Sequence, residues 1–238
     1  TDTGIAAPIS TFKPATDDRP YMFEPGFRLM APALLAASLA LTMLIVQLGR
    51  ERRVPGNLRR GAGAALIGAL TMALQVLVIY RVQTAVGSPA LAMSIALGAV
   101  LGGAGVGALL IADKIASINF WRYAGLSAAC GVALLVLLGP WTVAVCASLS
   151  EHWAALLMLG VVAVCCAPIG LPFLAVIETC RSVSGQGEGL AIGCDGLGGV
   201  VGAAAATMIA MTFGFNWLGL ILVLGFCIFI LLRPDDIY

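Results

Sequence analysis

Charge is scarce in this sequence. Of 238 residues, 61% are hydrophobic and 11% are charged, and 13 Lys and Arg against 12 Asp and Glu leave a formal net charge of +1. Soluble domains average about 25% charged residues, so this composition excludes an ordinary soluble fold. A net charge near zero also gives no basic surface for nucleic acid. The sequence therefore predicts a membrane protein that contacts the lipid bilayer and binds no nucleic acid.

The residues that carry enzyme chemistry are also few. His152 is the only histidine, so the chain by itself supplies neither a bis-histidine haem site nor a histidine-based zinc site. The sequence contains no G-x-S-x-G elbow and no P-loop lysine motif. Its 7 cysteines lie mostly in apolar runs and lack CxxC spacing, which favours apolar packing over disulfides or metal ligation. We expect no catalytic residue, metal or cofactor in this chain.

Long apolar windows dominate what is present. A helix needs about 20 apolar residues to cross roughly 30 Å of hydrocarbon, and seven windows of about that length occur. They predict an all-α, polytopic transmembrane bundle of about seven helices within residues 28–238. The predicted spans are 29–49, 61–80, 90–112, 124–148, 153–177, 190–212 and 215–232.

The basic residues predict an orientation for these spans. Most of them fall in connections on one side of the membrane, including the cluster Arg50, Arg52, Arg53, Arg59 and Arg60. Because basic connections stay in the cytoplasm, we expect the amino terminus outside and the carboxyl terminus inside. The 11 Arg against 2 Lys are typical of GC-rich bacterial coding, which favours the bacterial inner membrane.

Residues 1–27 differ in kind from the spans. Pro8, Pro14, Pro20 and Pro25 interrupt them, and no helical or strand period is visible. We predict an extended, proline-rich arm that lies either on the chain's own helices or on a partner.

Glycines repeat at four-residue spacing in two of the predicted helices. Such faces let helices approach closely in lipid, so we expect them to pack against neighbouring helices, and a glycine-lined substrate path is the alternative. The pairs are Gly98 with Gly102, Gly103 with Gly107, and Gly198 with Gly202.

Ionisable residues near membrane depth are candidates for binding a partner or ligand, because burying them is costly. Asp195 lies inside the sixth span among glycines, whose bare backbone leaves room for water, a cation or a partner side chain. Glu178 and Arg181 are three residues apart and are expected to pair at the membrane interface. Arg81 is expected to extend to the headgroups. Asp195 is thus the candidate without an evident partner in its own segment.

Several segments resemble one protein family. Residues 15–23 read ATDDRPYMF and include Asp17, Asp18 and Arg19. They resemble the T-D-D-R-P-(Y/F)-x-F segment that joins an aminopropyltransferase-like domain to the following helices in bacterial spermidine synthase-like integral membrane proteins. Residues 75–89 are similar to that family's E-x-x-x-I-Q-R-F-x-x-x-x-G-H-P stretch, with Gln75 near the usual Glu and Arg81 at the Arg.

The resemblance continues toward the carboxyl end. Residues 168–173 are similar to the family's P-x-G-x-P-F helix end, and residues 195–215 resemble its N-G-(small)n-x-F-G-F close, with Asp195 at the usual Asn. The resemblance spans about residues 15–232. It implies the membrane portion of a split or truncated relative, without the domain that would bind a nucleoside cofactor.

These observations favour a noncatalytic integral membrane subunit that packs against and stabilises a larger membrane protein complex. One alternative is a small-solute or polyamine transporter, for which Asp195 is the inward-facing acid. Another is a membrane anchor for a split spermidine synthase-like enzyme. We therefore expect other membrane protein subunits as partners.

Overall fold

The computed structural model describes residues 27–51, 57–111, 120–181 and 187–233, and their regular structure is entirely helical. The prediction of an all-α bundle is confirmed for these residues. The predicted arm, apart from Phe27, lies outside them. The helices are α1 (Phe27–Glu51), α2 (Asn57–Val86), α3 (Pro89–Ile111), α4 (Phe120–Cys146), α5 (Glu151–Cys166), the 3-10 turn η3 (Ala167–Ile169), α6 (Gly170–Arg181), α7 (Gly187–Phe213) and α8 (Phe215–Leu231).

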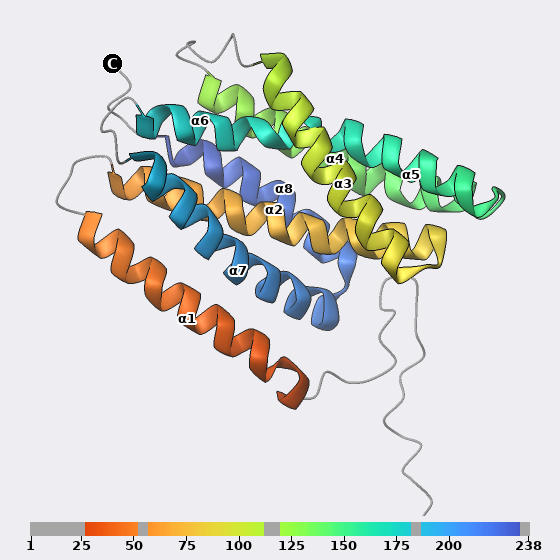
Figure 1. The fold of residues 1–238 in the computed structure, drawn as a ribbon, viewed down its shortest axis with the longest axis horizontal. Helices are drawn as coiled ribbons and strands as arrows, with labels where there is room; N and C mark the ends of the chain where they lie inside the picture. Colours follow the sequence, from red (N-terminus) through yellow and green to blue (C-terminus); the bar gives the residue numbers. More distant parts are fainter. Residues whose placement is uncertain (1–26, 52–56, 112–119, 182–186, 234–238) are drawn as a thin grey trace, which may run out of the picture.

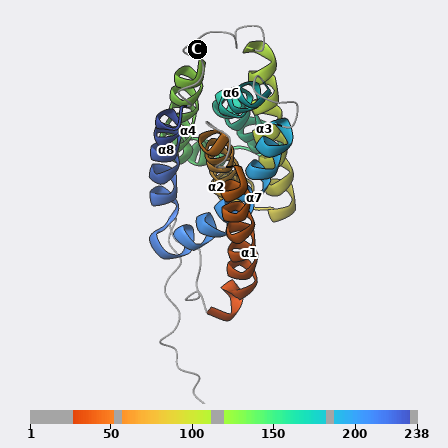
Figure 2. The same ribbon diagram turned by 90° about the vertical axis from the view of Figure 1, so that its left-hand side faces the viewer.

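Helix α2 is the centre of the bundle. It contacts α1, α3, α4, α5, α6, α7 and α8, and Figure 2 shows α4 and α8 on one side of it and α3 on the other. Its Leu74, Leu77 and Val78 side chains are fully buried in the main hydrophobic core. Helix α1 lies at the margin, where it rests on α7 and α2 (Figure 1). Contacts to α2 therefore hold most of the bundle together.

The two ends of the bundle differ. Successive spans alternate in direction, so residues 87–88, 147–150 and 214 join helices at one end, which we call the short-turn end (Figure 1). At the other end, α1, α3 and α6 finish and α2, α4 and α7 begin. We call it the arginine-rich end, because Arg50 lies in the last turn of α1 and Arg59 in the first turn of α2.

The chain is a multi-pass membrane protein. Within the described residues, five helical segments are long and apolar enough to cross a bilayer, and α1 and α8 each contain a shorter apolar helix. Large apolar side chains such as Leu109 and Leu110 are exposed on the outside of the bundle, where lipid covers them. Trp141, Trp153 and Trp217 are also exposed, and all three lie near the short-turn end. Tryptophan favours the headgroup level, so these residues mark one membrane surface.

The predicted span 153–177 is one long helical segment with a break inside it. Residues 151–181 run from α5 through η3 into α6, and Pro168 lies in the 3-10 turn. Because proline has no backbone N–H and clashes with the preceding turn, it disturbs an α-helix at this position. At this break α5 ends at Cys166, and α6 continues the segment from Gly170 to Arg181.

Two of the predicted glycine faces lie at close helix contacts. A Cβ on Gly198 or Gly202 of α7 would collide with the backbone carbonyl of Ala65 or Ala69 of α2. Gly103 and Gly107 of α3 lie in the same way against the carbonyls of residues 163 and 167. Only glycine allows backbones to approach so closely. These residues therefore set the distance between α2 and α7, and the distance between α3 and the segment formed by α5 and η3.

Gly98 and Gly102 do not take part in such a contact within the described residues. No heavy atom of the described residues lies within 4 Å of the position that a Cβ would take on Gly98 or Gly102. The expectation that they pack against a neighbouring helix of this chain is therefore corrected. The physical reason is helical geometry: Gly98 and Gly102 are one residue out of step with Gly103 and Gly107, so they lie on a different side of α3.

Candidate functional site

Side chains from α2 and α8 meet at the short-turn end of the bundle. The Arg81 Nη2 group donates a hydrogen bond to Oδ1 of Asn216 at 3.2 Å. Beside it, the rings of Tyr80 and Phe215 are stacked, with centroids 3.7 Å apart and planes 5° from parallel. Arg81 and Asn216 are 135 residues apart in the sequence. The fold thus brings the end of α2 and the beginning of α8 together.

Two glycines allow this junction to form. Gly214 is the single residue between α7 and α8 and has φ of +94°, a conformation that L side chains rarely adopt. It lets the chain reverse at once, which places Phe215 and Asn216 beside α2. On α4, a Cβ on Gly139 would lie 3.4 Å from Arg81 Nε, so the missing side chain leaves room for the guanidinium group.

A pocket of about 460 Å³ adjoins the stacked rings. Its polar lining consists of an amide, a hydroxyl and a phenol, from Gln83, Thr84 and Tyr80, and the Thr84 hydroxyl donates to the Tyr80 carbonyl at 2.9 Å. No carboxylate is among the lining residues, so the pocket suits binding by hydrogen bonds and apolar contact rather than acid–base chemistry. The lining residues are Val76, Ile79, Tyr80, Gln83, Thr84, Gly87 and Phe215.

Arg81, expected to extend to the headgroups, is half-buried at this junction and bonded to Asn216. Gln75 lies deeper in α2, where its side chain is 9% exposed. It is not among the residues that line the pocket. The structure therefore brings Arg81, but not Gln75, to the candidate site.

Asp195 is half-buried on α7, away from the short-turn end. Its backbone carbonyl lies against Gly68 of α2. No heavy atom of the described residues lies within 4 Å of a Cβ position on Gly193 or Gly196, which flank it. The bare backbone expected around Asp195 is thus present. A role of its carboxylate in binding a ligand or partner stays a prediction.

The expected pairing of Glu178 with Arg181 is wrong. Arg181 instead faces Glu188 of α7, with 3.6 Å between Nε and Oε1, and both side chains are more than half exposed. The physical reason is the tight contact between α6 and α7, where Gly187 lies against the Cys180 carbonyl and brings Glu188 close. A pair this exposed contributes at most about 1 kcal/mol. It joins two helix ends rather than forming a binding site.

Two buried groups at the arginine-rich end are not predicted by the sequence analysis. Arg60, expected in a cytoplasmic connection, is 2% exposed and lies within α2. Trp121 of α4 donates from Nε1 to the Phe229 carbonyl of α8 at 3.0 Å, and the two rings are stacked 4.4 Å apart.

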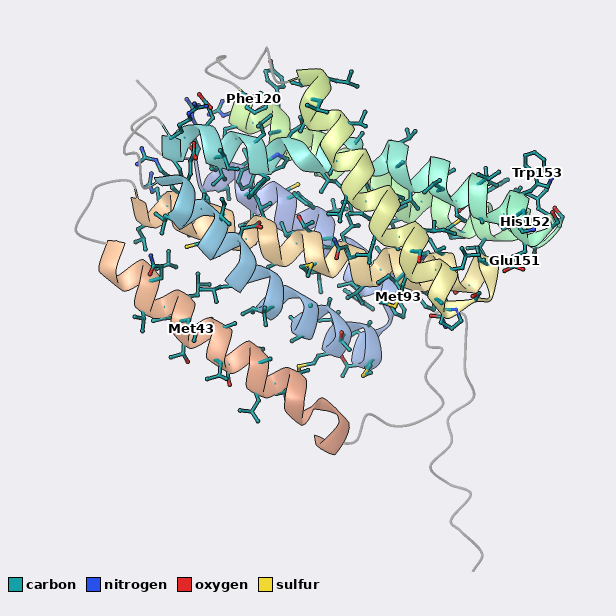
Figure 3. All side chains as sticks on the ribbon, in the orientation of Figure 1. Met43, Met93, Phe120, Glu151, His152 and Trp153 are labelled. Atoms are coloured by element: carbon teal, nitrogen blue, oxygen red, sulfur yellow. The ribbon has the colours of Figure 1, made fainter. Side chains whose placement is uncertain are left out.

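The sole histidine lies at the short-turn end, opposite the end that holds Arg60 and Trp121. His152 projects with Glu151 and Trp153 at the tip where α4 turns into α5, and all three are exposed (Figure 3). In the part of the chain that the structure describes, no three His, Cys, Asp or Glu side chains gather as metal ligands. Asp17, Asp18 and Arg19 of the predicted arm lie outside the described residues.

Comparisons with known proteins match nothing to this chain, whether made against protein-family models, curated proteins or solved structures.

Proposed function

We propose that this multi-pass membrane protein is a noncatalytic subunit of the bacterial inner membrane that packs against a larger membrane protein complex and stabilises it. The observation that carries the proposal is the outer face of α3. Gly98, Gly102 and Gly105 lie on it with no heavy atom of the described residues within 4 Å of their Cβ positions. This outer glycine face is the surface on which a partner helix docks.

The inner side of the same helix supports this assignment. There, Gly103 and Gly107 let α3 lie directly on the backbone of α5 and η3. In lipid, close van der Waals packing is a main driving force for helix association, and small residues make it available. The outer glycine face offers a second bare surface. Leu101 and Leu109, both exposed, flank it and supply apolar side chains for a partner's surface.

The test is copurification of partners after gentle detergent extraction. The wild-type chain is expected to elute with stoichiometric membrane proteins. Gly102→Leu fills the outer glycine face and is expected to reduce their recovery at least about tenfold, equivalent to about 1.4 kcal/mol. Gly160→Leu on α5 is the matched control, because its Cβ position is equally open and lies on another helix. A monodisperse wild-type monomer, or equal loss of partners in both variants, contradicts the proposal.

A second candidate function is a membrane anchor for an aminopropyltransferase-like domain. One observation favours it: Tyr80 and Phe215, which belong to two of the segments that carry the family resemblance, stack on each other at the short-turn end. Co-expression with a separately encoded aminopropyltransferase-like domain provides the test. Recovery of that domain with the membrane fraction only when this chain is present supports the anchor, and its recovery without the chain argues against it.

A further inference from the structure

The pocket beside the stacked aromatic rings lies where α7 leaves α2. Closer to the arginine-rich end, glycines of α7 cover the face of α2 that carries Ala65 and Ala69. The same face continues at three- and four-residue spacing through Val76, Ile79 and Gln83, which line the pocket. Figure 1 shows α7 separating from α2 toward the short-turn end. One face of α2 is therefore closed in its first half and open in its second.

The lining suits an extended peptide with an aromatic side chain. Tyr80 and Phe215 supply aromatic walls, and Val76 and Ile79 supply apolar ones. The exposed Gln83 amide has both a donor and an acceptor for a peptide backbone. Proline-rich segments bind aromatic-lined grooves through these two kinds of contact.

Helix α1 starts level with this pocket. Its residues Met43 and Val46 line one groove with Gly193 of α7, and the two helices run in opposite directions. Counting back along both helices from there places Phe27 within about one helical turn of the level of Gly214. Gly214 leads directly into Phe215. Residues 1–26 thus join the bundle at the end where the pocket lies.

This segment is long enough to reach the pocket. Tyr21, in the stretch ATDDRPYMF at residues 15–23, is six residues before Phe27. An extended chain of that length spans about 20 Å. Helix α1 packs on α7, which packs on α2, and two helix spacings add up to about 16–20 Å. The Tyr21 ring is therefore within reach of the pocket.

Charge favours the same occupant. Arg81 is half-buried beside the stacked rings, and its guanidinium group donates to the neutral amide of Asn216. Among the described residues, no carboxylate pairs with it. Asp17 and Asp18 lie just before Tyr21 in the sequence and supply that negative charge. Because the segment is tethered to α1, its effective concentration at the pocket is on the order of mM, which favours it over a separate chain.

We propose that residues 15–23 bind in this pocket, with the Tyr21 ring against the aromatic walls and the backbone at the Gln83 amide. The segment closes the face of α2 that α7 leaves open. It also ties the start of α1 to the turn between α7 and α8. This proposal assigns the predicted arm to the chain's own helices rather than to a partner.

Maleimide labelling of Thr84→Cys in the purified full chain tests the proposal, in a background where the exposed Cys130 and Cys227 are replaced by Ser. Thr84 lines the pocket. Tyr21→Ser is expected to raise the labelling rate at least about tenfold, because a buried aromatic ring no longer holds the segment in place. Ser94→Cys on α3 is the matched control. Both positions are exposed and carry a hydroxyl bonded to the carbonyl four residues earlier, so Ser94→Cys is expected to be labelled equally fast with and without Tyr21→Ser.

Disulfide formation is an independent measurement. With Met22→Cys and Thr84→Cys in one chain, mild oxidation of dilute protein is expected to join the two residues, as read by mass spectrometry of the peptides. Met22→Cys with Ser94→Cys is expected to form at least about tenfold less disulfide, since only a docked segment holds residue 22 at the pocket.

Three outcomes would overturn the proposal. An unchanged labelling rate of Thr84→Cys after Tyr21→Ser shows that the segment does not cover the pocket. Disulfides that form only between chains place the segment on a second copy. Protection of Thr84→Cys that is present in a copurified complex and absent in the isolated chain identifies a partner's segment as the occupant.

Discussion

At the scale of single residues, a hydrogen bond to a charged group links α2 and α8. Arg81 donates to Asn216 at 3.2 Å. We predict a coupling free energy of about 1 kcal/mol between the two side chains in a double-mutant cycle of Arg81→Ala and Asn216→Ala, at the low end for a charged donor because the bond is exposed. The measurement is the thermal midpoint of unfolding in detergent. Additive losses would show that the bond contributes nothing to stability.

Trp121 makes the corresponding link at the opposite end. Its Nε1 group donates to the Phe229 carbonyl in a buried setting, and its ring stacks on Phe229. Trp121→Phe keeps an aromatic ring but removes the donor, so we predict a loss of about 1 kcal/mol, or a midpoint roughly 2–4 °C lower. Trp217→Phe is the control because Trp217 is exposed, and it is expected to shift the midpoint little. Circular dichroism measures both, and equal shifts would contradict the role of the donor.

At the scale of elements, the contact of α2 with α7 depends on glycine. The Cβ of Gly198→Ala would meet the Ala65 carbonyl, so the two helices must separate. We predict a loss of about 2 kcal/mol, which lowers the thermal midpoint by roughly 4–8 °C. Gly196→Ala, two residues away, points into open space and is expected to be neutral or stabilising because alanine favours the helix. If both variants unfold at the wild-type midpoint, close backbone contact does not stabilise this pair.

The elements also show what apolar pattern alone predicts. Long charge-free runs predict the number, order and type of the spans, because only a helix satisfies its own backbone in lipid. The pattern does not predict that α2 begins before Arg60, since a buried arginine depends on neighbours from other helices. It also does not predict the break at Pro168 inside a helix. Neighbouring helices tolerate such a break, which would end a helix in isolation.

At the scale of the whole molecule, sequence predicts single residues of the candidate site but not their association. Arg81 stands out as a charge at the end of a span. Its partner Asn216 does not, because a polar residue just inside a helix carries no signal of a contact across 135 positions. The open face at Gly98 and Gly102 has the same spacing as the buried face at Gly103 and Gly107. Only the packed structure shows which of the two glycine pairs contacts another helix within the described residues.

The bundle as a whole has one orientation in the membrane, and the distribution of charge predicts it. Because basic residues gather at the arginine-rich end, we expect that end in the cytoplasm and the short-turn end outside. The test uses a variant in which the exposed Cys130 and Cys227 are replaced by Ser. In intact cells, a membrane-impermeant maleimide is expected to label Ser148→Cys at the short-turn end and to label Arg122→Cys only after permeabilisation. The reverse pattern would place the arginine-rich end outside.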